Sequence, residues 1–188
     1  MGLAGGLRSV PRIKHEGRRL SELLEKHEKF YRNHPGGEQA DLRGADLSRA
    51  NLAGMILARA ILHRANLEGA DLRGAKLTAA DFSGANLRKA DLRNTDMTEA
   101  RLAGADLSEA QASGVEFYRC DLSNTNFRLA NLRNANFRGA NVNGAKFSGA
   151  DMDVAILRET DLTGADLSGV DLKTALMPRG VVPTTVKQ

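Results

Sequence analysis

The sequence is dominated by a five-residue repeat. An apolar residue stands at every fifth position from Leu42 to Met177, twenty-eight times without an insertion. Two residues before these centre positions comes a small residue in nearly every unit, most often Ala, with Met55 as an exception, and the residue between the two is usually Asp or Asn. Many units end in Gly, so the repeat reads A(D/N)LxG.

A period of five fits neither a regular helix nor a flat strand. A step of five residues rotates about 140° around a helix, so the centre residues would spiral around the cylinder instead of forming one stripe. In a straight strand, an odd period would send successive centre residues to opposite faces. A chain that turns a corner once in each unit keeps the centre and the small residue inside, which predicts a solenoid.

Three segments carry a resemblance to a known family, namely ADLRGADLSRANL, ANLEGADLRGAKL and ANLRNANFRGANV. They resemble the pentapeptide-repeat family. The resemblance covers residues 40–177 and implies an all-β solenoid, a right-handed quadrilateral β-helix with four units per coil. Twenty-eight units then give about seven coils, and at about 4.8 Å per coil the rod is roughly 30 Å long.

The chain outside the repeats divides into short segments. We expect an amphipathic helix from about residue 14 to residue 33, ended by Pro35-Gly36-Gly37. The expected organisation is a flexible N-terminus (1–13), a helical leader or cap (14–39), the β-helix (40–177) and a C-terminal tail (178–188).

One side of the expected helix is apolar, and it consists of Leu20, Leu23, Leu24, His27, Phe30 and Tyr31. The open end of a β-helix exposes its core and unpaired backbone groups, so this helix is expected to cover the first coil. The alternative is a docking or dimerising helix. The leader is also similar to a short segment found ahead of many bacterial pentapeptide-repeat domains.

The centre positions contain several aromatic residues. Phe117 and Phe137 fall on one face in adjacent coils, and Phe127 and Phe147 fall on the opposite face, so two stacked pairs are predicted. The single Cys120 occupies an inward position and is expected to be a buried structural thiol.

Composition and charge restrict the function. Residues 1–39 carry eight Lys/Arg against five Asp/Glu, a net of +3, whereas residues 40–177 carry seventeen against eighteen, a net of −1. Nucleic-acid binding calls for a continuous basic stripe, which this balance does not favour. The repeated Asp and Asn are expected to bond turn backbone, and no catalytic or metal-ligand spacing is found. We therefore expect no enzyme activity, no cofactor and no metal, and no apolar run is long enough to span a membrane.

Two outward sets are candidate interaction residues. Arg73, Arg93 and Arg133 occupy the position after the centre on one face, where carboxylates lie nearby, so the face is either laced with ion pairs or open to an anionic partner. Ile156 and Leu176 replace the usual Asp or Asn and share a second face with Tyr118. Exposed apolar groups near one end favour a protein contact, including a homodimer through a β-helix end.

These observations predict a non-enzymatic scaffold in the cytoplasm that binds another protein, with neither nucleic acid nor a membrane as partner. One alternative comes from the resemblance, since quinolone-resistance members of the family act as DNA mimics that bind gyrase. That role depends on an acidic rod, and the rod here is nearly neutral. A second alternative is an effector or membrane-associated adaptor.

Overall fold

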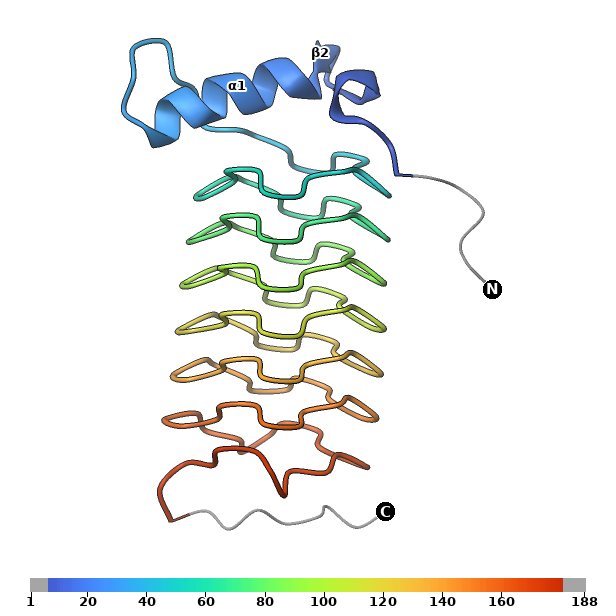
Figure 1. The fold of residues 1–188 in the computed structure, drawn as a ribbon, viewed down its shortest axis with the longest axis vertical. Helices are drawn as coiled ribbons and strands as arrows, with labels where there is room; N and C mark the ends of the chain where they lie inside the picture. The colour runs from blue at the N-terminus through green and yellow to red at the C-terminus, as the bar shows by residue number, and fades with distance from the viewer. Residues whose placement is uncertain (1–6, 181–188) are drawn as a thin grey trace.

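The repeats form a rod that is covered at one end by the leader (Figure 1). The computed structural model describes residues 7–180. The leader contains a short 3-10 helix η1 (Val10–Arg12), the strands β1 (Lys14–His15) and β2 (Arg18–Arg19), and the helix α1 (Leu20–Tyr31). In the rod, bridging residues pair in parallel with residues twenty positions further on, such as Asp46 with Asn66. Four units therefore make one turn, and the predicted right-handed quadrilateral β-helix of about seven coils is confirmed.

Each corner of the coil is a tight turn that begins at a centre residue. The N–H of Ala45 donates to the carbonyl of Leu42 at 3.1 Å, and equivalent bonds recur along the rod. In the units centred on Leu42 through Leu167, the residue two positions after the centre has a positive φ, whether it is Gly44 at 63° or Leu129 at 57°. Glycine adopts this conformation without steric cost, which explains why so many units end in Gly.

Successive coils are joined by backbone hydrogen bonds. The N–H of Leu47 donates to the carbonyl of Asn66 at 2.7 Å, and the N–H of Asn66 donates to the carbonyl of Ala45 at 2.9 Å. This pattern pairs each internal coil with the coil above it and the coil below it. The polar backbone groups beside the apolar interior are thereby satisfied.

The core is a continuous column of side chains along the axis of the rod. The centre residues from Leu42 to Leu157 are almost fully buried, and so are the small residues beside them except Met55, which is 37% exposed. Phe117 and Phe137 stack with ring centroids 5.1 Å apart. Phe127 and Phe147 also stack with centroids 5.1 Å apart, so both predicted pairs are confirmed.

The two stacked pairs also touch each other across the core. The rings of Phe117 and Phe127 meet edge to face with centroids 5.6 Å apart, and those of Phe137 and Phe147 meet at 5.7 Å. The repeat predicted the vertical stacks but not these lateral contacts, which depend on ring orientation. The four rings therefore form one aromatic cluster.

Cys120 is buried, as predicted. Its thiol donates to the carbonyl of Met97 at 2.8 Å. Burial disfavours the thiolate and raises the pKa of Cys120 to about 12. The thiol is a packing group of the core.

The leader differs from the expected helix over residues 14–33. Helix α1 covers only Leu20–Tyr31, and β1 and β2 form an antiparallel hairpin in front of it. The hairpin turn is Glu16-Gly17, and both residues have a positive φ, 49° and 79°. A two-residue turn of this kind matches the twist of a hairpin, so it competes successfully with the helix at this point.

Within the segment expected to be a flexible N-terminus, the structure describes residues 7–13, and these residues contact the rod. Arg8 pairs in parallel with Ala50 of the first coil. The N–H of Arg8 donates to the carbonyl of Arg49 at 2.6 Å, and the Arg8 side chain bonds Asp46 at 2.8 Å. Ile13 is almost fully buried in the core cluster. Residues 7–13 are therefore held against the top of the rod, because they satisfy backbone groups that have no coil above them.

Candidate interaction surface

The repeated Asp and Asn side chains form hydrogen bonds that stabilise the coil. Asp46 Oδ1 accepts a hydrogen bond from the N–H of Ser48 at 3.1 Å, and the same contact recurs at many other units. Asn side chains also link neighbouring coils, for example where Asn86 donates to Asn66 at 3.0 Å. Within residues 7–180, no group of three or more His, Cys, Asp or Glu side chains is placed to hold a metal ion. These polar residues are accounted for by the backbone they support.

The three arginines predicted as one candidate set are each paired with a carboxylate. Arg73 bonds Asp71 at 2.6 Å, and Arg93 bonds Asp91 at 2.6 Å. Arg133 pairs with Asp153 and lies 3.5 Å from Asp151. The hydrogen bond from Arg73 holds the pKa of Asp71 below its ordinary value.

This face was expected either to be laced with ion pairs or to be open to an anionic partner. In the structure, its arginines form ion pairs. Lys173, on the same face, follows the pattern and lies 3.5 Å from Asp171.

The leader helix lies across the first coil (Figure 1). Leu20, Leu23 and Leu24 belong to the same buried cluster as the first centre residues. His27 is also fully buried, and its Nδ1 accepts a hydrogen bond from the N–H of Ala40 at 3.0 Å. Four of the six predicted residues therefore face the rod.

The other two predicted helix residues are less covered. Phe30 is half-buried beneath the guanidinium of Arg59, which lies 5.2 Å from the ring centroid. Tyr31 is 42% exposed. The apolar side of the helix leaves little surface for a docking partner.

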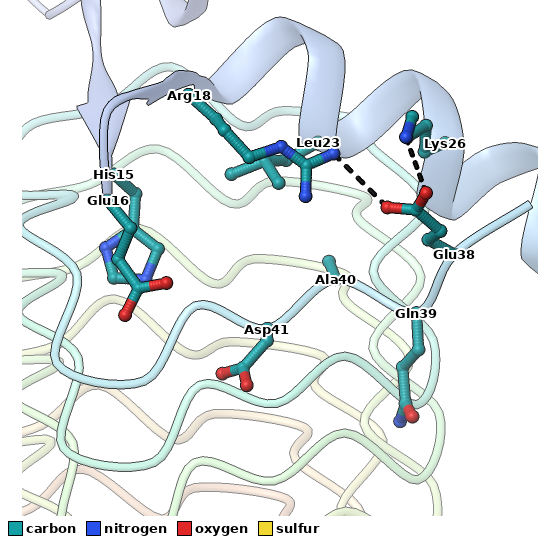
Figure 2. Close-up of a pocket in the computed structure, with 9 residues that line it drawn as sticks. All are labelled: His15, Glu16, Arg18, Leu23, Lys26, Glu38, Gln39, Ala40 and Asp41. Atoms are coloured by element: carbon teal, nitrogen blue, oxygen red, sulfur yellow. Dashed lines mark hydrogen bonds and ion pairs between the residues drawn. The ribbon is translucent and has the colours of Figure 1, made fainter.

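A small polar hollow lies between the hairpin, α1 and the first coil (Figure 2). It has a volume of about 80 Å³. Glu38 accepts hydrogen bonds from Arg18 at 3.2 Å and from Lys26 at 2.5 Å. His15 and Asp41 line the opposite side. Glu38 thus joins β2 and α1 of the leader to the segment that enters the first coil, through one cation from each element.

The C-terminal end of the rod is less covered than the N-terminal end. Leu42, Leu47, Leu52 and Leu57 in the first coil are fully buried. In the last coil, by contrast, Leu162, Leu167 and Met177 are only partly buried. The leader accounts for this difference, because it covers the first coil alone.

Ile156 and Leu176 meet on one face near this end. They pair directly in adjacent coils. Leu176 is 41% exposed, and Ile156 is half-buried. Tyr118 lies on the same face nearer the middle of the rod, with the guanidinium of Arg119 located 5.0 Å from its ring centroid. The structure thus brings Ile156 and Leu176 together and places Tyr118 further along the face.

Four arginines, Arg119, Arg138, Arg158 and Arg179, lie at the same end of the rod, and the sequence reasoning did not identify them. Arg138 forms two hydrogen bonds with Glu159, at 2.8 Å and 3.0 Å. Besides Arg138, the charges of Arg119 and Arg179 help to lower the pKa of Glu159. Arg138, Arg158, Glu159 and Arg179 also line a surface hollow of about 800 Å³ together with Met177 and Pro178.

We call this surface the C-terminal patch, and it consists of Tyr118, Arg119, Arg138, Ile156, Arg158, Glu159, Leu176, Met177, Pro178 and Arg179. The sequence alone could have placed two of these arginines on the face of Tyr118. Arg138 and Arg158 occupy the same position of the repeat as Tyr118, one and two coils further on.

A family model for pentapeptide repeats matches residues 40–78, 75–111, 116–153 and 135–173, in eight copies. Among solved structures, the rod is similar to full-length QnrB1, a plasmid-mediated fluoroquinolone resistance protein. The two are 23% identical with a TM-score of 0.70 over 79% of this chain and 78% of QnrB1. A trypsin-treated variant of QnrB1 is 25% identical with a TM-score of 0.68, over 78% of this chain and 76% of the variant.

HetL is a pentapeptide repeat protein involved in heterocyst differentiation regulation from the cyanobacterium Nostoc sp. strain PCC 7120. It is 31% identical over 76% of this chain and 83% of HetL, with a TM-score of 0.31. No curated protein matches the chain.

Proposed function

This chain belongs to the pentapeptide-repeat family, and from that membership we propose that it is a non-enzymatic scaffold that binds another protein through the C-terminal patch. One observation carries the proposal. Ile156 and Leu176 are paired apolar side chains at a repeat position where Asp or Asn usually stands. The coil does not require them, because a polar side chain at this position bonds the turn backbone and they do not.

The position of the leader also favours a partner surface at the C-terminal end of the rod. It already covers the N-terminal end, where Leu20, Leu24 and His27 are buried. The partly buried centre residues lie at the opposite end, beside the patch. A paired apolar group with a charged rim is the usual composition of a protein-binding surface.

A photocross-linking experiment tests this proposal. Benzoylphenylalanine replaces Leu176 in one sample and Thr163 in another, since both positions are exposed in the last coil but on different faces. Each purified protein is irradiated in a lysate of the cells that make it. We expect the sample with the probe at position 176 to yield a reproducible adduct with one protein, which the control lacks. No adduct specific to position 176 would overturn the proposal.

A second candidate function is favoured by the likeness of the rod to QnrB1. It is the DNA-mimic, gyrase-binding role that the family resemblance implies. The near-neutral charge of residues 40–177 argues against it, because a DNA mimic needs a negative potential along one face. Gyrase supercoiling assays with a fluoroquinolone test it directly, and protection by the purified protein would move this candidate ahead of the scaffold.

The alternative of a membrane-associated adaptor stays a prediction, as does the cytoplasmic location. No helix within the described residues is long and apolar enough to cross a membrane. Flotation with anionic vesicles tests surface association, and recovery of the protein with the vesicles would support the adaptor.

A further inference from the structure

We infer that the C-terminal patch binds an acidic polypeptide segment that carries an apolar side chain. This inference rests on the proposed function and specifies the chemistry of the partner. Carboxylates of the segment would lie against the arginines of the patch, and its apolar side chain would cover Leu176 and Ile156.

The charge of the patch is the first argument. Arg119, Arg158 and Arg179 make no ion pair within the described residues, whereas Arg138 is paired with Glu159. Arg73 and Arg93 on another face differ from these arginines, because each of them is paired with an aspartate of its own unit. The patch therefore carries an uncompensated positive charge, and a guanidinium binds a carboxylate with two parallel hydrogen bonds when one is offered.

The surface hollow is the second argument. Arg158 and Arg179 line it together with Met177 and the paired Glu159. An extended segment lying there could place carboxylates against Arg158 and Arg179 while its apolar side chain covers Leu176. Exposed ion pairs alone contribute little to affinity, so the adjacent apolar surface is needed to hold the segment.

The same features favour a polypeptide over nucleic acid. The patch extends from Tyr118 to Pro178, three coil steps or roughly 15 Å, which is short for a surface that follows a phosphate backbone. Arg119 lies over one face of the Tyr118 ring, so that face is already occupied and does not stack on a base. Ile156 and Leu176 fit an aliphatic or aromatic side chain of a peptide.

The chain offers a closely matched control for the charge. Arg158 and Arg128 both follow a centre residue, and Arg179 and Arg64 both stand one position later in their units. Arg128 and Arg64 lie on other faces and make no ion pair within the described residues. The double variant Arg158→Glu/Arg179→Glu and its control Arg128→Glu/Arg64→Glu therefore change the net charge equally, at equivalent repeat positions.

The test measures binding of labelled synthetic peptides by fluorescence anisotropy. One peptide alternates Glu with Leu, a second alternates Glu with Ser, and a third alternates Gln with Leu. We expect the Glu/Leu peptide to bind the wild type most tightly. Its affinity should fall about tenfold or more in Arg158→Glu/Arg179→Glu and change little in the control. Circular dichroism and thermal unfolding check the fold, and Arg158→Gln/Arg179→Gln replaces the charge reversal if that variant unfolds.

Three outcomes overturn the inference. The first is no binding of the Glu/Leu peptide, or an equal loss in Arg128→Glu/Arg64→Glu. The second is tighter binding of a single-stranded oligonucleotide that the Arg158→Glu/Arg179→Glu variant abolishes, which would assign the patch to nucleic acid. The third is a wild-type dimer in sedimentation that the same variant dissociates, which would assign the patch to a second copy. If the peptides fail but the cross-link at position 176 persists, the scaffold stands and only the acidic partner is wrong.

Discussion

The imidazole of His27 accepts a hydrogen bond of 3.0 Å from the N–H of Ala40, the residue at which the β-helix begins. This bond joins the middle of α1 to the first unit of the rod. It requires Nδ1 to be unprotonated, because only the bare nitrogen can accept. His27 is fully buried, and burial is the main reason that its pKa lies below the ordinary value for histidine.

We expect the leader to loosen in mild acid. The pKa of His27 is lowered in the folded protein, so the unfolded chain binds the proton more tightly. The stabilisation from neutral His27 is therefore complete above a pH of about 6.5, and it is lost as the pH falls through the lower folded pKa. The nearby positive charge of Arg59 acts in the same direction. The loss is at most about 1.4 kcal/mol per pH unit.

Thermal unfolding between neutral and mildly acidic pH measures this effect. His27→Gln is the control, because its amide oxygen can accept the bond from Ala40 but does not titrate. A wild-type curve that runs parallel to that of His27→Gln would show that His27 is not the group responsible.

Two residues on the apolar side of α1, Leu20 and Tyr31, are expected to contribute unequally to stability. Leu20 is fully buried, whereas Tyr31 on the same helix is 42% exposed. Leu20→Ala should lower the free energy of unfolding by about 2–5 kcal/mol, and Tyr31→Ala by no more than about 0.5 kcal/mol. Urea unfolding followed by circular dichroism measures both. Similar losses in the two variants would contradict the placement of the helix.

The aromatic cluster should behave as a coupled unit. The rings of Phe127 and Phe147 are nearly parallel, at 3°, with centroids 5.1 Å apart. A double-mutant cycle with Phe127→Leu and Phe147→Leu should give a coupling energy of about 0.5–1.5 kcal/mol. Phe82 is not among the ring partners of Phe127, so a cycle between these two should give about zero. Urea unfolding of the variants measures both energies, and equal coupling in the two cycles would argue against a specific stacking contribution.

Leu129 is expected to be a strained corner residue. Its φ is 57°, a conformation that costs a side chain with a β-carbon, and the side chain is 68% exposed, so little burial offsets the cost. Leu129→Gly should therefore raise the free energy of unfolding by up to about 1 kcal/mol. Leu129→Ala keeps the β-carbon and should bring no comparable gain. The two variants are compared by urea unfolding, and a destabilised glycine variant would show that the leucine packs favourably on its neighbours.

The repeat predicts the backbone of the rod and its inward positions because every unit repeats the same physical requirement. Leu42 and Phe147 lie 105 residues apart and occupy equivalent inward positions. Once one coil is understood, the stacking, the Asp contacts and the corner backbone follow. The paired state of Arg73 also follows, because its aspartate stands two residues earlier in the same unit.

The leader and the C-terminal patch have no such repetition, and the sequence predicted them less well. Glu16-Gly17 forms a hairpin where apolar spacing favoured a helix, since one two-residue turn outweighed the local helical pattern. At the patch, Arg138 pairs with Glu159 in the next coil. Pairing across coils depends on side-chain rotamers, so the fixed spacing did not reveal which arginines lack a partner.

Cys120 should be unreactive in the folded protein. Its sulfur is buried and bonded to the carbonyl of Met97, and its pKa is raised to about 12, so almost no thiolate is present at neutral pH. Ellman's reagent should detect no thiol under native conditions and one thiol per chain in guanidinium. The modification rate at intermediate guanidinium should follow the fraction of unfolded protein. Rapid labelling without denaturant would mean that the coil around Cys120 and Met97 opens in the folded protein, and it would contradict the prediction.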